Sequence, residues 1–82
     1  MLKDETIRFW LTHHYLRKIA KKDPKFFMGL IDEVTDNLNE IKVMHKRYVD
    51  HLKFEAIAID MNVDVRFVFR LHRKVIDKLI SL

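Results

Sequence analysis

Apolar residues recur every three or four positions along almost the whole chain, and this spacing restricts the fold more than any other feature of the sequence. From Asp4 to about Lys21, the apolar residues in this pattern are Ile7, Trp10, Leu11, Tyr15, Leu16, Ile19 and Ala20. A stripe of that width is typical of a helix with one buried face. With one glycine and one proline in 82 residues, the chain also has few residues suited to strand bends. The sequence therefore predicts an all-α fold of four or five helices.

Capping signals divide the part of the chain that follows. Asp23 followed by Pro24 predicts an N-cap and a proline at the first helical position, where its missing N–H costs nothing. The apolar face after it contains Phe27, Leu30, Ile31, Val34, Leu38, Ile41, Met44, Tyr48 and Leu52. Within this run Asn37 is a second candidate N-cap, with Glu40 three residues later. The run is therefore either one long helix or two.

The length of 82 residues predicts a single domain, residues 1–82, with a modest core and no room for an enclosed active site. We expect this core to be completed by aromatic residues of the first part, with a dimer face as the alternative: Trp10, Tyr15, Phe26 and Phe27. The absence of cysteine excludes disulfides and suits a reducing cytosol. The longest apolar run, Phe26 to Ile31, is far shorter than the roughly 20 residues of a membrane span. A soluble, cytoplasmic protein is expected.

The helical pattern stops and restarts around Asn62. The sequence predicts a helix from Phe54 to Met61 and a longer one from Asp64 to about Leu79. Asn62 belongs to a residue type that tolerates the left-handed conformation at a helix end, and Asp64 is a strong N-cap. Two helices joined so tightly must cross steeply.

The residues around this turn match the spacing of a helix-turn-helix. Ala58 supplies the small residue that a close crossing needs, and Val68 and Leu71 supply apolar anchors in the second helix. An ordinary helical hairpin is the alternative. We therefore predict a C-terminal helix-turn-helix within the all-α fold.

The distribution of charge indicates that the second helix of this motif contacts DNA. From Val65 to Leu82 there are five basic residues and one acidic residue, which matches the formal net charge of +4 for the whole chain. Arg66, Arg70 and Arg73 lie on one helical face, opposite the apolar anchors. An α-helix fits the major groove of DNA, where arginine pairs with guanine. A second basic run, from Arg17 to Lys25, is expected to be the solvated end of the first helix.

The segment from Arg47 to Leu79, RYVDHLKFEAIAIDMNVDVRFVFRLHRKVIDKL, resembles the C-terminal promoter-reading domain of bacterial sigma factors. It is also similar to the small sigma-like regulators of phages that infect Gram-positive bacteria. The matching parts are the helix end RYVDHL, the first helix FEAIAIDM, the turn NVD and the long basic helix. Residues 37–82 form the sigma-like region under this resemblance, and the N-terminal helices of residues 1–36 have no assigned role.

The resemblance implies that residues early in the second helix contact DNA bases, namely Val65, Arg66, Phe69, Arg70 and Arg73. The basic character and position of four further residues predict contacts with phosphates, namely Lys53, His72, Lys74 and Lys78.

The chain departs from the family pattern in both helices of the predicted helix-turn-helix and at the residue before them. Lys53 stands where the family usually has a capping serine or threonine. We therefore expect the N-terminus of the helix that starts at Phe54 to be less stable. Ile59, Phe67 and Phe69 are apolar at positions that are usually polar. We expect the N-terminal helices to cover and bury these three side chains. The alternative is that they form a partner surface or contact a thymine methyl group.

The histidines and acids do not predict chemistry. No histidine pair has the four-residue spacing of helical metal ligands, so we expect no metal or other cofactor. His13 or His14 should complete the face of the first helix. Without cysteine, and with Ser81 as the single serine, no activated nucleophile or glycine-rich phosphate loop is visible. We therefore expect a protein that is not an enzyme.

The function predicted from these features is sequence-specific binding of double-stranded DNA by a transcriptional regulator of a bacterial cell or a phage-infected host. Host RNA polymerase and a second copy of the chain are candidate partners. One alternative is a protein-binding module, an inhibitor or RNA polymerase-binding factor, that uses the exposed aromatics and the basic helix. Another is a phage packaging or replication protein that binds DNA. No membrane partner is expected.

Overall fold

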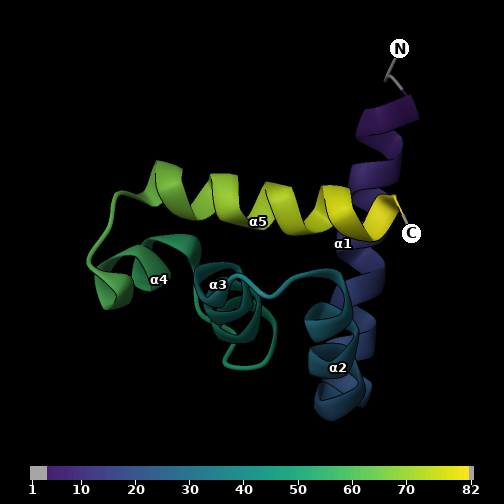
Figure 1. Ribbon diagram of the computed structural model, residues 1–82, viewed down its shortest axis with the longest axis horizontal. Helices are drawn as coiled ribbons and strands as arrows, with labels where there is room; N and C mark the ends of the chain where they lie inside the picture. The colour runs from purple at the N-terminus through teal and green to yellow at the C-terminus, as the bar shows by residue number, and fades with distance from the viewer. Residues whose placement is uncertain (1–3, 82) are drawn as a thin grey trace.

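Five helices make up the part of the chain that the computed structural model describes, which is the backbone of residues 4–81 and the side chains of residues 11–81. They are α1 (Asp4–Lys22), α2 (Pro24–Val34), α3 (Leu38–Tyr48), α4 (Phe54–Met61) and α5 (Val65–Ile80). In Figure 1, α1 and α2 lie at one end of the molecule, α4 lies at the other, and α3 lies between them. The long helix α5 runs across this arrangement and packs on all four other helices. The described part of the chain is thus all-α, and none of its helices is long and apolar enough to cross a bilayer.

Local capping contacts set the first helix boundaries. The carboxylate of Asp23 accepts a hydrogen bond of 3.0 Å from the backbone N–H of Phe26, and Pro24 opens α2, which confirms the predicted start. The side-chain oxygen of Asn37 accepts hydrogen bonds from the N–H groups of Asn39 and Glu40, at 3.0 and 3.1 Å. Because this cap begins a new helix, the apolar run after Pro24 is divided into α2 and α3.

The turn between α4 and α5 has the geometry expected from its residues. Asn62 adopts the left-handed conformation, with φ 57° and ψ 48°. The N–H of Val63 donates to the carbonyl of Ala58 at 2.9 Å, which satisfies a carbonyl at the end of α4. One carboxylate oxygen of Asp64 accepts the N–H of Arg66 at 2.8 Å and begins α5. Three residues, 62–64, therefore separate the two helices.

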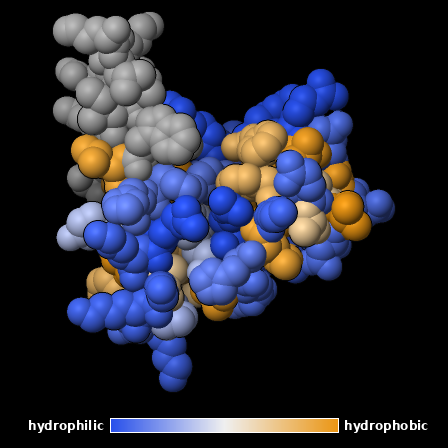
Figure 2. Space-filling model, turned by 180° about the vertical axis from the view of Figure 1, so that it is seen from behind, coloured by the Kyte–Doolittle hydropathy of each residue, from blue (hydrophilic) through white to orange (hydrophobic). Residues whose placement is uncertain are grey.

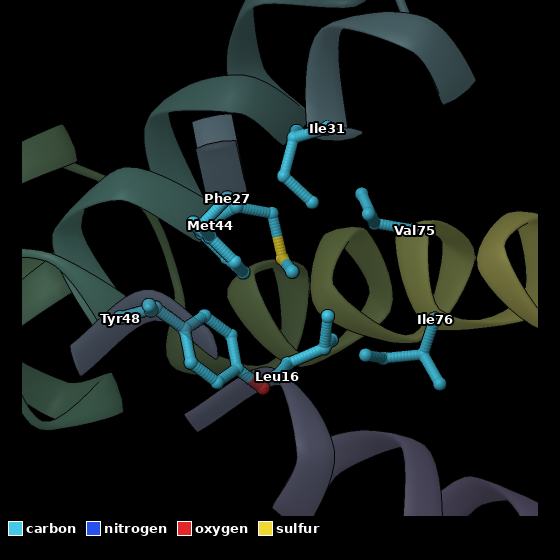
Figure 3. Close-up of a cluster of buried hydrophobic side chains, with 8 residues drawn as sticks. Leu16, Phe27, Ile31, Met44, Tyr48, Val75 and Ile76 are labelled. Carbon is cyan, nitrogen blue, oxygen red and sulfur yellow. The ribbon is translucent and has the colours of Figure 1, made fainter. Parts of the chain in front are cut away.

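Buried side chains form two clusters. The first lies where α1, α2, α3 and the C-terminal half of α5 meet, and its side chains converge in Figure 3; it consists of Leu16, Ala20, Phe27, Ile31, Met44, Tyr48, Val75 and Ile76. The second joins α3, α4 and the N-terminal half of α5, and consists of Val43, Ile57, Ala58, Val68 and Leu71. Helices α3 and α5 contribute to both clusters, so they connect the two ends of the molecule.

Some aromatic residues expected in the core lie on the surface instead. Phe27 is fully buried, as predicted, but Tyr15 and Phe26 are exposed. These two lie on the outer sides of α1 and α2, which no other described element covers. The prediction that they complete the core is therefore wrong. The side chain of Trp10 lies outside the part of the chain whose side chains the structure describes.

The expected burial of the unusual apolar residues near the turn is also wrong for two of the three. Ile59 is 81% exposed and Phe69 is 46% exposed, whereas Phe67 packs partly against the second cluster. The reason is that α4 contacts α3 and α5 but neither α1 nor α2, so no N-terminal helix reaches this end. Seen from behind in Figure 2, hydrophobic side chains gather over the α4 end of the molecule.

Candidate nucleic-acid interface

Helix α5 divides into an inner and an outer face. Its buried side chains are Val68, Leu71, His72, Val75 and Ile76. Its outer face carries the exposed basic residues Arg66, Arg70, Arg73 and Lys74. The two faces differ because the apolar residues recur at helical spacing and pack on the other helices. The arginine row therefore projects outward from a helix that the core holds in place.

Two of these arginines contact acidic residues of their own helix. Arg66 Nε lies 3.3 Å from an oxygen of Asp64, and Arg73 Nε lies 3.1 Å from an oxygen of Asp77. The hydrogen bonds from Arg66 lower the pKa of the Asp64 carboxyl below its usual value. All four side chains are more than half exposed. Exposed ion pairs of this kind contribute little to stability and exchange readily for other anions.

Arg70 differs from its two neighbours in the row. It is exposed and forms no ion pair with any residue that the structure describes. Its charge contributes weakly to lowering the pKa of Asp64, after the larger effects of Arg66. Among the three arginines it is the one whose guanidinium needs no rearrangement before it binds a ligand.

The remaining residues predicted to contact bases lie beside this row. Val65 is half-buried against the second cluster, so only part of its side chain is accessible. Phe69 packs its ring on that of Phe54, with the ring centroids 5.0 Å apart, and keeps its other face in solvent. Both residues are therefore close to the arginine row, but neither side chain is fully open.

His72, which the sequence predicts to contact a phosphate, lies in the interior of the molecule. His72 is only 4% exposed, and its Nε2 lies 2.7 Å from the hydroxyl of Tyr48. It follows Val68 and precedes Ile76 by four residues each, so it lies in the buried stripe of α5. A spacing argument applied to this histidine alone would have found its position.

Lys78, which is also predicted to contact a phosphate, is paired with two side chains of its own molecule. Its Nζ lies 2.7 Å from a carboxylate oxygen of Glu40 and 3.2 Å from the hydroxyl of Thr35. Glu40 is buried, so the ammonium group neutralises a charge that the fold has removed from water. Lys53 and Lys74 are exposed, and these two remain accessible to a phosphate.

Arg47 belongs to this surface, although the sequence did not single it out. Its guanidinium lies over the ring of Phe54, 4.3 Å from the centroid, and donates a hydrogen bond of 3.1 Å to the carbonyl of Leu52. Phe54 in turn contacts Phe69. A basic surface therefore extends from α5, across two aromatic rings, to the end of α3. Only the path of the loop after α3 creates this contact, and periodicity does not predict that path.

Two histidines and a tyrosine form a hydrogen-bonded group behind the surface, in which Tyr48 and His72 are buried and His13 is half-buried. The Tyr48 hydroxyl lies 2.8 Å from Nδ1 of His13 and 2.7 Å from Nε2 of His72. A phenol has one proton, so it donates to one ring and accepts an N–H from the other. Burial lowers the pKa of His72 to about 3, and burial together with the charges of Arg47 and Arg17 lowers the pKa of His13. Both rings are therefore neutral at pH 7 and join α1, α3 and α5.

Comparisons with family models, with curated proteins and with solved structures find no match for this chain. The similarity of residues 47–79 to sigma factors stays an expectation from the sequence. Within the described residues, no group of three or more histidine, aspartate or glutamate side chains is placed to hold a metal ion. The function is therefore argued from the geometry and charge of the α4–α5 surface.

Proposed function

We propose that the protein binds double-stranded DNA with α5 in the major groove, as a sequence-specific transcriptional regulator of a bacterial cell or an infecting phage. The observation that carries the proposal is the left-handed turn at Asn62, which fixes α5 against the core with its arginine row outward. A helix fits the major groove, and an arginine side chain pairs with the O6 and N7 atoms of guanine.

In this proposal α4 and α5 form a helix-turn-helix. Ala58 is buried in α4 and shares a cluster with Val68 and Leu71 of α5, which supports the close crossing that such a motif requires. Arg66, Phe69, Arg70, Arg73 and the accessible part of Val65 face bases. Lys53 and Lys74 face phosphates, and these contacts set the register of the protein on the duplex.

The acidic residues beside the arginines fit this role. Without DNA, Asp64 forms an ion pair with Arg66, and Asp77 forms one with Arg73. Because both pairs are exposed, guanine or phosphate oxygens can replace the carboxylates with little loss. The same carboxylates repel a backbone that approaches in the wrong register, which favours specific over non-specific binding.

Arg70 gives the most direct test of this function. Operators are first selected from a random duplex pool with the purified protein, and their affinity is then measured by fluorescence anisotropy. Arg70→Ala should weaken binding to the selected duplex by about 1–3 kcal/mol and relax the preference at one base pair, while the far-UV circular dichroism spectrum stays unchanged.

Lys25→Ala is the matched control for that experiment. Lys25 is exposed at the start of α2, at the opposite end of the molecule from α4, so its loss should leave the affinity nearly unchanged. Equal losses in the two variants would assign the binding to net charge alone. Failure of the wild-type protein to bind any duplex at low salt would exclude DNA as the ligand.

The exposure of Ile59 favours a second function for the α4 end, binding of another protein. Ile59 is 81% exposed on α4, which leaves an apolar side chain on this surface that DNA phosphates do not use. We propose RNA polymerase as the partner. Ile59→Lys should abolish binding of the purified polymerase in a sedimentation assay while the affinity for duplex is retained. Unchanged polymerase binding by this variant would exclude the α4 surface.

A further inference from the structure

A basic pocket lies between α1 and the C-terminal end of α3, and none of the residues of the outer face of α5 lines it. It has a volume of about 480 Å³. Its basic lining comes from three residues of α1, one of α3 and one of the loop that follows, namely Arg17, Lys18, Lys21, Arg47 and His51. Tyr48 and His14 complete the wall. Among the side chains that the structure describes, no carboxylate lines this pocket, so no lining residue balances its positive charge.

The packing of α1 on α3 places these cations together. Leu16 and Ala20 are buried in the first cluster, and the adjacent face of α1 carries Arg17 and Lys21 four residues apart. The hydrogen bond of 2.8 Å between the Tyr48 hydroxyl and Nδ1 of His13 fixes how the two helices align. The pocket is therefore built by the core and does not depend on flexible loops alone.

Arg47 is held in place before any ligand arrives. Its stacking on Phe54 and its hydrogen bond to the carbonyl of Leu52 fix the guanidinium at the edge of the pocket. A fixed guanidinium loses little conformational freedom when it binds an anion, and its planar donors match the oxygens of a phosphate.

His51, which also lines the pocket, has a strained backbone. Its φ of 60° is in the left-handed region, which residues other than glycine adopt infrequently and histidine more often than most of them. Such strain persists where the surrounding structure enforces it, and it is concentrated at sites that bind ligands. Here the strained residue closes the pocket wall just after α3.

The uncompensated charge acts against folding. Burial lowers the pKa of His13, and the charges of Arg47 and Arg17 lower it further. Elsewhere several cations pair with acids, as Lys46 does with Asp60 and Lys78 does with Glu40. A cluster of like charges that the fold leaves without acids is relieved when an anion binds.

We propose that this pocket binds phosphate groups through Arg17, Lys21 and the fixed guanidinium of Arg47. Two sources supply this chemistry, a nucleic-acid backbone and a free polyphosphate. The geometry favours the backbone of the duplex held by α5, a choice that rests on the proposed function. Arg47 contacts Phe54 at 4.3 Å and Phe54 contacts Phe69 at 5.0 Å. The pocket edge is therefore nearer to α5 than the width of a major groove, about 12 Å.

The test compares two double variants with the same loss of charge. Arg17→Gln with Lys21→Gln removes two cations from the pocket, whereas Lys22→Gln with Lys25→Gln removes two exposed cations that do not line it. Circular dichroism and the melting temperature would check that both variants fold. Because all four side chains are exposed, neither change should disturb the core.

The first probe is tripolyphosphate, followed by calorimetric titration, and it does not depend on DNA binding. The wild type and the Lys22, Lys25 control should bind it with similar affinity, and the pocket variant at least about tenfold more weakly. If the wild type binds no duplex, the proposed function fails while this probe still decides whether the pocket takes phosphate.

The second probe is the selected duplex at several salt concentrations. The pocket variant should bind this duplex about tenfold more weakly. The negative slope of its log K against log salt should become shallower by about two, while the control changes both quantities much less. A loss with duplex alone would assign the site to the DNA backbone, and a loss with tripolyphosphate alone would assign it to a free ligand. Identical behaviour of the two double variants with both probes would overturn the proposal.

Discussion

At the scale of single residues, Asn62 has a left-handed backbone conformation that limits which residues can replace it. An alanine there must adopt the same left-handed geometry, which alanine tolerates less well than asparagine does. Asn62→Ala should lower the free energy of unfolding by about 1–2 kcal/mol, whereas Asn62→Gly should stay within about 1 kcal/mol of the wild type. Urea denaturation followed by circular dichroism measures both. Equal stability of the two variants would show that the turn carries no strain.

The buried imidazole of His72 makes stability depend on pH. Burial lowers its pKa to about 3, so the unfolded chain, with a pKa near 6.5, binds the proton more readily. Stability should therefore be constant above about pH 7 and fall below pH 6.5, by about 1.4 kcal/mol per pH unit for each such group. His13, whose pKa burial also lowers, acts in the same direction.

Urea titrations between pH 4 and 8 measure this dependence. His72→Gln removes the titrating group while it keeps a hydrogen-bonding partner for the Tyr48 hydroxyl. The slope of stability against pH should become smaller in this variant. A slope as steep as that of the wild type would assign the pH dependence to other groups.

At the scale of secondary-structure elements, α4 begins without a side-chain cap. Lys53 precedes it in an extended conformation and makes no capping hydrogen bond, as its departure from the family pattern predicted. Lys53→Ser should raise the free energy of unfolding by about 0.5–2 kcal/mol because a serine hydroxyl can accept an N–H of the first turn. The same change removes a proposed phosphate contact, so duplex affinity should fall as stability rises. Denaturation and anisotropy measure the two effects, and a parallel change in both would contradict this separation.

Three elements meet at the buried carboxylate of Glu40. It receives hydrogen bonds from Lys78 of α5 and from Thr35, which follows α2. Lys78→Ala leaves this charge without its cation and should destabilise the fold by about 1–3 kcal/mol. Adding Glu40→Gln should restore most of the loss because the remaining group is neutral. A double-variant cycle by thermal denaturation checks this, and additive losses would contradict it.

Element boundaries were predictable because local side chains determine them. Asp23, Asn37 and Asp64 cap helices through contacts within three residues along the chain, and the sequence identified each one. The candidate site was predictable only for residues in the middle of the outer face of α5. The pocket cations and Ile59 depend on which helices meet, and no local pattern encodes that α1 stops short of α4.

At the scale of the whole molecule, the two hydrophobic clusters differ in how many helices support them. Four helices meet in the first cluster, whereas α4 is held only by α3 and α5 in the second. Amide hydrogen exchange should therefore be faster in α4 than in α2 and the centre of α3, through an opening that leaves the first cluster intact. Exchange measured by mass spectrometry would contradict this if α2 and α4 were equally protected.

The outer side chains of α5 make no contribution to either cluster, and this has a consequence for descent. Arg66, Arg70 and Arg73 can be exchanged without loss of the framework beneath them. Lineages that inherit these five helices are then free to vary the row, each acquiring its own preference among targets. Substitutions in such a group should be concentrated at those positions and rare in the buried stripe. Its members would then share a fold while their exposed residues differ.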